Sequence, residues 1–200
     1  MKYILLCMCL LSLLGCGTDT NTQQDTKPTT TANEQVKTEQ DTHVMAAKQA
    51  LSSGDYAKAV EEANAAIKAD ANNGEAYSIR GFATALNGDT TKGLADTKKA
   101  YDLDPNNVAN YYNMAMVYKL QGQLPESKRW FEKVLEKDPS NTWSVYGIAT
   151  IYADQGDDTK ALDWLEKAIK IDPSVKAVAA EQDHFERFHN NARFKTLVGL

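Results

Sequence analysis

The fold is decided by the stretch at residues 74–107, GEAYSIRGFATALNGDTTKGLADTKKAYDLDPNN, because its pattern recurs along the chain at a fixed interval. Glycine recurs at this interval, and so does aspartate: Gly54, Gly88, Gly122 and Gly156; Asp70, Asp104, Asp138 and Asp172. Three further slots hold small residues: Ala47, Gly81, Ala115 and Ala149; Ala59, Gly93, Ser127 and Ala161; Ala66, Ala100, Val134 and Ala168. Such a fixed register predicts a solenoid of stacked repeats.

Each copy reads as two amphipathic helices. The glycine slot ends the first helix, because glycine tolerates the positive φ of a helix end. Pro105, Pro139 and Pro173 follow three of the aspartates, and the residue before a proline avoids the α region, which ends the second helix. Pro125 falls near the start of a second helix, where its missing N–H costs little. One such hairpin cannot bury both its faces, but four stacked hairpins make a continuous core.

These slots resemble the tetratricopeptide repeat, a unit of two antiparallel helices. The resemblance covers residues 40–175 as four repeats and implies an all-α, right-handed superhelical solenoid. The first repeat is the weakest, with Ala71 where the others have proline, as expected for an end that faces solvent. Residues 176–200 resemble the closing stretch of such arrays and predict C-terminal capping helices, through Asp183, Phe185, Phe188, Phe194 and Leu197. A partner-docking tail is the alternative interpretation.

Residues 1–15 are interpreted as a signal peptide. Residues 3–14 are apolar apart from Ser12, but twelve helical residues span only ~18 Å, too short for a hydrocarbon core of ~30 Å. The segment ends Leu-Leu-Gly-Cys at Cys16, which resembles a bacterial lipobox. That resemblance implies cleavage before Cys16 and a lipid on its sulfur. Gly17 is not the aspartate of inner-membrane retention, which implies the outer membrane if the host has two. An ordinary secreted protein with an incidental cysteine is the alternative.

Residues 16–39 are predicted to be the lipidated cysteine followed by a disordered tether. Threonine, glutamine, aspartate and asparagine dominate residues 17–39, and Val36 is their only large apolar residue. Such a segment cannot bury enough apolar area to offset its chain entropy. A flexible coil of this length spans about 25–30 Å, enough to lift a domain clear of lipid headgroups. A glycosylated stalk is the alternative, since threonine-rich stretches can carry sugars.

Composition argues against several function classes. The 200 residues carry a net charge of −5, which disfavours a general nucleic-acid binder. The cysteines, Cys7, Cys9 and Cys16, all lie within positions 1–16, so the folded body has no cysteine for a disulfide or a metal site. His184 and His189 are five apart, off the helical spacing of a metal pair. No phosphate loop or zinc-protease motif appears, and we expect no enzyme, cofactor or metal.

The resemblance implies that the first helix of each repeat lines a concave face. Register then places six residues in a protein-binding groove: Phe82, Tyr112, Met116, Lys119, Trp143 and Tyr146. Aromatic and thioether side chains are common interface anchors, although some of these could pack between repeats instead. The carboxylate clamp of one subfamily is not expected, because Val44, Ser78, Tyr112 and Tyr146 occupy one of its slots. A hydrophobic or extended peptide fits better. Trp130 and Trp164 share a second-helix slot and are assigned a structural role.

The sequence therefore predicts a membrane-anchored, non-enzymatic scaffold or adaptor for protein partners in the bacterial cell envelope. The alternative is an assembly or regulatory accessory, pilotin-like or a cell-wall-enzyme adaptor, for a secretion, pilus or peptidoglycan machine. Architecture alone does not separate these two. A true enzyme or small-molecule binder would need a closed polar pocket, which a groove of four repeats does not obviously supply.

Overall fold

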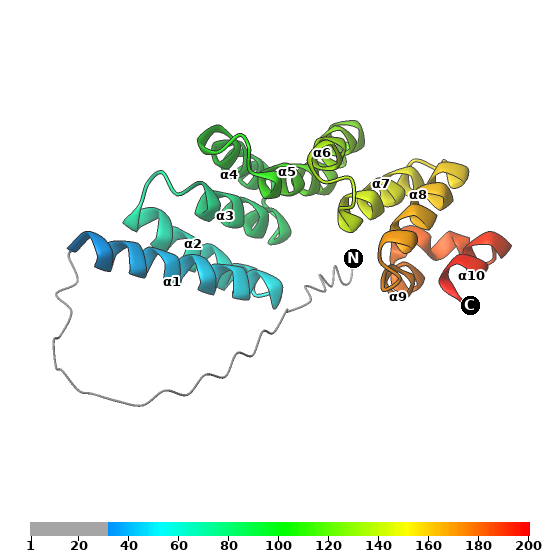
Figure 1. Ribbon diagram of the computed structural model, residues 1–200, viewed down its shortest axis with the longest axis horizontal. Helices are drawn as coiled ribbons and strands as arrows, with labels where there is room; N and C mark the ends of the chain where they lie inside the picture. Colours follow the sequence, from blue (N-terminus) through cyan, green and yellow to red (C-terminus); the bar gives the residue numbers. More distant parts are fainter. Residues whose placement is uncertain (1–31) are drawn as a thin grey trace, which may run out of the picture.

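The computed structural model describes residues 32–200, and every regular element in that part of the chain is helical (Figure 1). The expected all-α solenoid is confirmed. The predicted signal peptide, Cys16 and most of the tether lie outside the described residues. The first four helices are α1 (Ala32–Ser52), α2 (Tyr56–Ala69), α3 (Gly74–Leu86) and α4 (Thr90–Leu103). The next four are α5 (Val108–Leu120), α6 (Leu124–Lys137), α7 (Thr142–Asp154) and α8 (Asp158–Ile171). The cap consists of α9 (Val175–Glu181), the 3-10 helix η1 (Asp183–Phe188) and α10 (Ala192–Val198).

The helix ends follow local chemistry. The four slot glycines all have positive φ, between 72° and 105°, as predicted for the end of a first helix. First helices α3, α5 and α7 start after Asn73, Asn107 and Asn141, whose side chains accept backbone N–H bonds. Aspartates do the same for α2, α4 and α8. Each such cap stabilises a helix by roughly 1 kcal/mol.

The first helix begins earlier than the predicted boundary at residue 40. α1 starts at Ala32, so residues 32–39, which the sequence assigned to a disordered tether, are helical. The reason is propensity: Ala32, Glu34, Gln35, Lys37 and Glu39 are strong helix formers that continue the helix without a break. Low apolar content is a guide to disorder only where no adjoining helix can extend into the segment.

The helices form two layers. First helices of neighbouring repeats pack together, α1 against α3 and α3 against α5. In the described part of the chain, no two second helices pack together to a similar extent. The first helices therefore form the inner, concave side, and the second helices form the outer side. Figure 1 shows this for the middle of the molecule, where α4 and α6 lie above α3 and α5. The cap closes the end formed by α7 and α8.

The expected cap residues cover the last repeat. Phe185, Phe188 and Phe194 are fully buried and belong to one apolar cluster with Leu165 of α8. Their rings lie 5.7–6.1 Å apart, a separation typical of favourable aromatic pairs. Within residues 32–200, no helix is both long enough and apolar enough to cross a bilayer.

Candidate functional site

Polar side chains bridge neighbouring first helices across the concave face. There is one bridge at each junction between repeats, and each joins two residues: Lys48 to Glu75 at 2.6 Å, Asn113 to Ser78 at 2.8 Å, and Lys119 to Thr150 at 2.5 Å. In the second bridge the Asn113 amide donates to the Ser78 hydroxyl, and in the third the Lys119 ammonium donates to the Thr150 hydroxyl. These contacts link the first helices that form the groove.

The junction between α5 and α7 is the most open one. These two first helices do not pack as α3 and α5 do, because the ring of Phe131 from α6 is inserted between them. The ring lies 5.7 Å from that of Tyr112 on α5. On the α7 side it touches the backbone of Gly147 so closely that a Cβ there would lie 2.6 Å from a ring carbon. Phe131 is fully buried and thus fills the space between α5 and α7.

Three of the six predicted groove residues keep partly exposed side chains at this junction: Tyr112, Met116 and Trp143. Tyr112 and Met116 lie on α5, and Trp143 lies at the start of α7. Although part of the side chain is exposed, neighbouring side chains shield the hydroxyl, and this burial raises the pKa of Tyr112 to about 12. Tyr112 is therefore a neutral phenol at physiological pH, with an apolar ring face and a polar tip.

Two predicted groove residues are buried. Phe82 is 2% exposed and packs with Ala85 and Val117 in the core between α3 and α5. Tyr146 is 8% exposed because the cap covers it, with its ring 5.9 Å from that of Phe185. Among the residues that the structure describes, none is a hydrogen-bond partner of its hydroxyl. Register places both residues on a groove-lining helix, but packing leaves them little surface to offer.

The sixth residue, Lys119, ends the groove. Its ammonium lies 3.2 Å from Nε2 of His184, which belongs to η1 of the cap. The other ring nitrogen of His184 lies 2.6 Å from the carboxylate of Asp154 at the end of α7. An Nδ1–H tautomer satisfies both contacts, donating to Asp154 and accepting from Lys119. The cap therefore reaches past its own repeat to α5 and limits the groove at this end.

The contact with the cap shields the Lys119 ammonium from most of the solvent. Burial lowers the pKa of Lys119 to about 8, and the negative charge of Asp154 opposes part of that shift. Its donors go to Thr150 and His184, so the lysine holds the cap and the groove together. Among residues 38–200, no three histidine or acidic side chains are grouped as a metal site would need.

Sequence reasoning missed Asp154 and His184 as residues of this surface. His184 of the cap pairs with Asp154, and no spacing rule joins residue 119 to residue 184. Only the path of the cap brings them together.

The comparisons with known proteins agree with this architecture. Two family models described as tetratricopeptide repeat match residues 44–108 and 107–174. A comparison with curated proteins finds no significant match.

Several solved structures are similar in fold. A thermophilic TPR protein of Thermus thermophilus matches with a TM-score of 0.67 at 16% identity, over 79% of this chain and 87% of that one. PilF of Pseudomonas aeruginosa matches with a TM-score of 0.67 at 13% identity, over 82% and 75%. YrrB, described as a TPR protein with an unusual peptide-binding site, matches with a TM-score of 0.54 at 15% identity, over 78% and 80%.

Proposed function

Because this chain belongs to the tetratricopeptide-repeat family, we propose that it is a non-enzymatic scaffold that binds an extended, largely apolar segment of a partner protein. The segment lies on the concave face at the junction of α5 and α7. The observation that carries the proposal is the aromatic and thioether surface at this junction. Tyr112, Met116 and Trp143 stay partly exposed there, over the buried ring of Phe131 that fills the space between α5 and α7.

The chemistry of the junction favours an apolar segment over a charged one. Lys119 is the cation at this point, and its ammonium is already bonded to Thr150 and His184. A partner carboxylate would have to displace those contacts to pair with it. Aromatic and thioether side chains instead gain from burial of apolar area, and rigid rings lose little entropy on binding.

The proposed location is the bacterial cell envelope, with Cys16 as the lipid anchor and the solenoid held clear of the membrane by the residues that follow. The support is the sequence of residues 1–16, in which a charged start, a short apolar run and a lipobox occur in order. An accessory role in a secretion, pilus or peptidoglycan machine is a narrower version of the same proposal, and the identity of the partner distinguishes them.

In-cell photo-crosslinking tests the groove. A benzophenone amino acid would replace Tyr112 or Trp143 in the groove, or Trp164 on the outer side as a matched aromatic control. The expected result is one discrete protein captured from both groove positions and not from residue 164. The purified partner should then bind the wild-type chain and bind Met116→Glu at least tenfold more weakly. Equal capture from residue 164 would contradict the groove proposal.

Fractionation of cells tests the anchor separately. Cys16→Ser removes the sulfur that would carry the lipid and leaves the solenoid unchanged, so the variant should leave the membrane fraction. Membrane retention of the processed variant would contradict a lipid anchor while leaving the groove proposal standing.

A further inference from the structure

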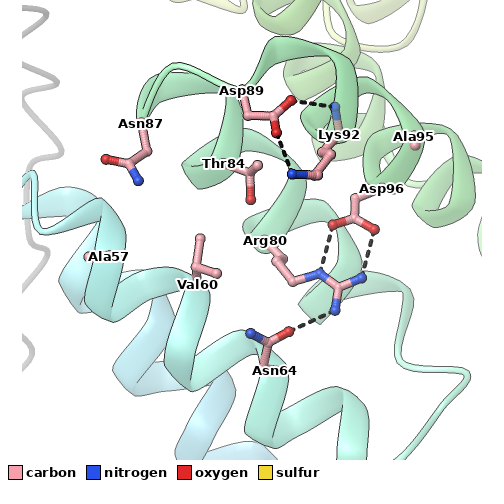
Figure 2. Close-up of a pocket in the computed structure, with 10 residues that line it drawn as sticks. All are labelled: Ala57, Val60, Asn64, Arg80, Thr84, Asn87, Asp89, Lys92, Ala95 and Asp96. Carbon is pink, nitrogen blue, oxygen red and sulfur yellow. Dashed lines mark hydrogen bonds and ion pairs between the residues drawn. The ribbon is translucent and has the colours of Figure 1, made fainter.

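A cleft of about 650 Å³ lies on the outer side of the solenoid, between α2 and α4. Figure 2 shows Ala57 and Val60 on the α2 side, Ala95 on the α4 side, and Thr84 of α3 between them. This size falls within the range of ligand pockets, roughly 300–1,000 Å³. The cleft is separate from the concave face, because α2 and α4 line it from the outer side and α3 contributes only Arg80 and Thr84.

The repeat register identifies what is missing from the cleft. Thr84 occupies the same repeat slot as Tyr118 and Tyr152. In the third and fourth repeats the first helix therefore carries a tyrosine at this slot, and both tyrosines are partly buried. Threonine lacks the ring, so the corresponding space in the second repeat stays open.

The rim of the cleft carries the same lysine–aspartate pair that lies next to Tyr152 in the fourth repeat. In the fourth repeat, Lys160 pairs with Asp157 at 2.7 Å, and its ammonium lies 5.2 Å from the centre of the Tyr152 ring. In the second repeat, Lys92 pairs with Asp89 at 2.8 Å in the same slots. The cation that lies over an aromatic ring in one repeat is thus present in the other repeat without its ring.

A rigid polar wall closes the opposite end. The Arg80 guanidinium donates two hydrogen bonds to the Asp96 carboxylate and one to the Asn64 amide oxygen, each 2.7 Å long (Figure 2). The positive charges of Arg80 and Lys92 are therefore matched by the adjacent carboxylates of Asp96 and Asp89. A neutral occupant suits such a balanced site better than a phosphate or a free cation.

We propose that this cleft is a docking site for a tyrosine or phenylalanine side chain carried by a partner protein. The ring lies over Thr84 and beside the Lys92 ammonium, as the Tyr152 ring lies beside Lys160. It takes the place that, by repeat register, Tyr118 and Tyr152 hold in the later repeats. The attraction combines burial of the ring against Ala57, Val60 and Ala95 with a cation–π contact. Because the cleft lies between two helices on the outer side, the partner's backbone can run along it.

This site is independent of the concave groove, and a purified protein tests it. The probe is the peptide acetyl-Ala-Ala-Tyr-Ala-Ala-amide, with a leucine-centred peptide as its control. Methyl-labelled alanine and threonine let nuclear magnetic resonance follow Ala57, Thr84 and Ala95 directly. The expected result is a saturable ring-current shift at these methyls, with the leucine peptide binding roughly fivefold more weakly because it lacks the aromatic contacts.

Thr84→Tyr is the decisive variant, since it gives the second repeat the residue of the third and fourth. Its own ring should fill the cleft, abolish the peptide-induced shifts and leave the melting temperature equal or higher. Ala95→Leu narrows the cleft from an exposed position and should weaken binding even if Thr84→Tyr folds poorly. Lys98→Tyr, also exposed on α4 and outside the cleft, adds a tyrosine without filling it and should bind as the wild type does.

Three results would overturn the proposal. The first is the absence of a saturable shift at millimolar peptide, and the second is equal binding of the tyrosine and leucine peptides. The third is binding of N-acetyltyrosinamide as tight as that of the pentapeptide, which would reassign the cleft to a free aromatic compound. Tighter binding of the pentapeptide supports a protein partner.

Discussion

The second and fourth repeats differ in how their two helices pack, although equivalent sequence positions form the contact in both. In the second repeat, α3 and α4 meet backbone to backbone, because Gly81 and Gly93 face each other. A Cβ on Gly81 would lie 2.8 Å from the Gly93 carbonyl oxygen. In the fourth repeat, α7 and α8 have alanines at these slots, Ala149 and Ala161, and bury Leu165 together with the aromatic rings of the cap.

The difference extends to single slots on the outer side. Asp96 in the second repeat corresponds to Trp164 in the fourth, and Arg80 corresponds to Ile148. One repeat therefore has an ion pair where the other has apolar residues. Close backbone approach and short polar side chains leave an open cleft, whereas rings fill the same space. A shared fold thus carries two distinct surfaces, because what fills the space between helices is free to vary.

The largest expected effect is the loss of stability when one aromatic ring of the cap is removed from the fourth-repeat core. Phe185→Ala deletes a fully buried ring that contacts Tyr146, Phe188 and Phe194. The cavity and the lost burial should lower the free energy of unfolding by about 3–5 kcal/mol. Urea denaturation followed by circular dichroism measures it.

Met45→Ala is the control for that loss, since Met45 is 64% exposed and its truncation should change stability by less than about 0.5 kcal/mol. A loss below about 1 kcal/mol for Phe185→Ala, far less than a buried ring contributes, would mean that the cap is not part of the cooperative core.

The next largest effect is expected in the second repeat, where adding one methyl group at Gly81 should disturb the close contact of α3 and α4. Gly81→Ala introduces the residue that the other three repeats have at this slot, and alanine is the better helix former by about 1 kcal/mol. We nevertheless expect a destabilisation of about 1–3 kcal/mol, because the new Cβ meets backbone atoms of Gly93 and Thr97 that cannot rotate away. Guanidinium denaturation measures the change.

The double variant Gly81→Ala with Gly93→Ala should be worse still, since a Cβ on residue 93 would lie 2.6 Å from the Gly81 oxygen. Stabilisation by Gly81→Ala would show that the glycines are incidental and that the two repeats pack alike.

The sequence predicted what local chemistry determines. Glycine at residues 54, 88, 122 and 156 has the positive φ that ends a helix, and the cap phenylalanines are buried as their spacing indicated. Register also identified the concave helices. Register failed for Phe82, which falls on a groove-lining helix yet lies in the core, because apolar side chains of α3 and α5 enclose it. The repeat register shows that Thr84 replaces a tyrosine, but it does not predict a cleft there until the positions of α2 and α4 are known.

The cap that covers the fourth repeat also buries a cation, Lys119, so the stability of this end of the molecule should depend on pH. Lys119 has a folded pKa of about 8, against an ordinary lysine pKa of 10.5. The unfolded chain therefore binds more protons between these values, and stability rises with pH across this window. The penalty is fully present below pH 8, and its relief from pH 7 to 9.5 should be about 1–2 kcal/mol.

Lys119→Met tests this assignment, because it keeps much of the length of the side chain and removes the charge. The variant also loses the hydrogen bonds to Thr150 and His184, so the pH dependence is the diagnostic: its stability should change less than that of the wild type between pH 7 and 9.5. A wild-type slope that survives in Lys119→Met would assign the pH dependence to another group.

The smallest expected effect concerns the hydroxyl of Tyr146, which lies under the cap without a hydrogen-bond partner among the described residues. Burial disfavours the phenolate and raises the pKa of Tyr146, so the group stays neutral and its desolvation is uncompensated. Tyr146→Phe removes only the oxygen and should raise the free energy of unfolding by up to about 1 kcal/mol. Tyr111→Phe is the matched control with the opposite sign, because the Tyr111 hydroxyl donates to the Pro105 carbonyl at 2.6 Å. Destabilisation by both variants would mean that Tyr146 has a partner in solution, and the cap would then be hydrated where it crosses the concave face.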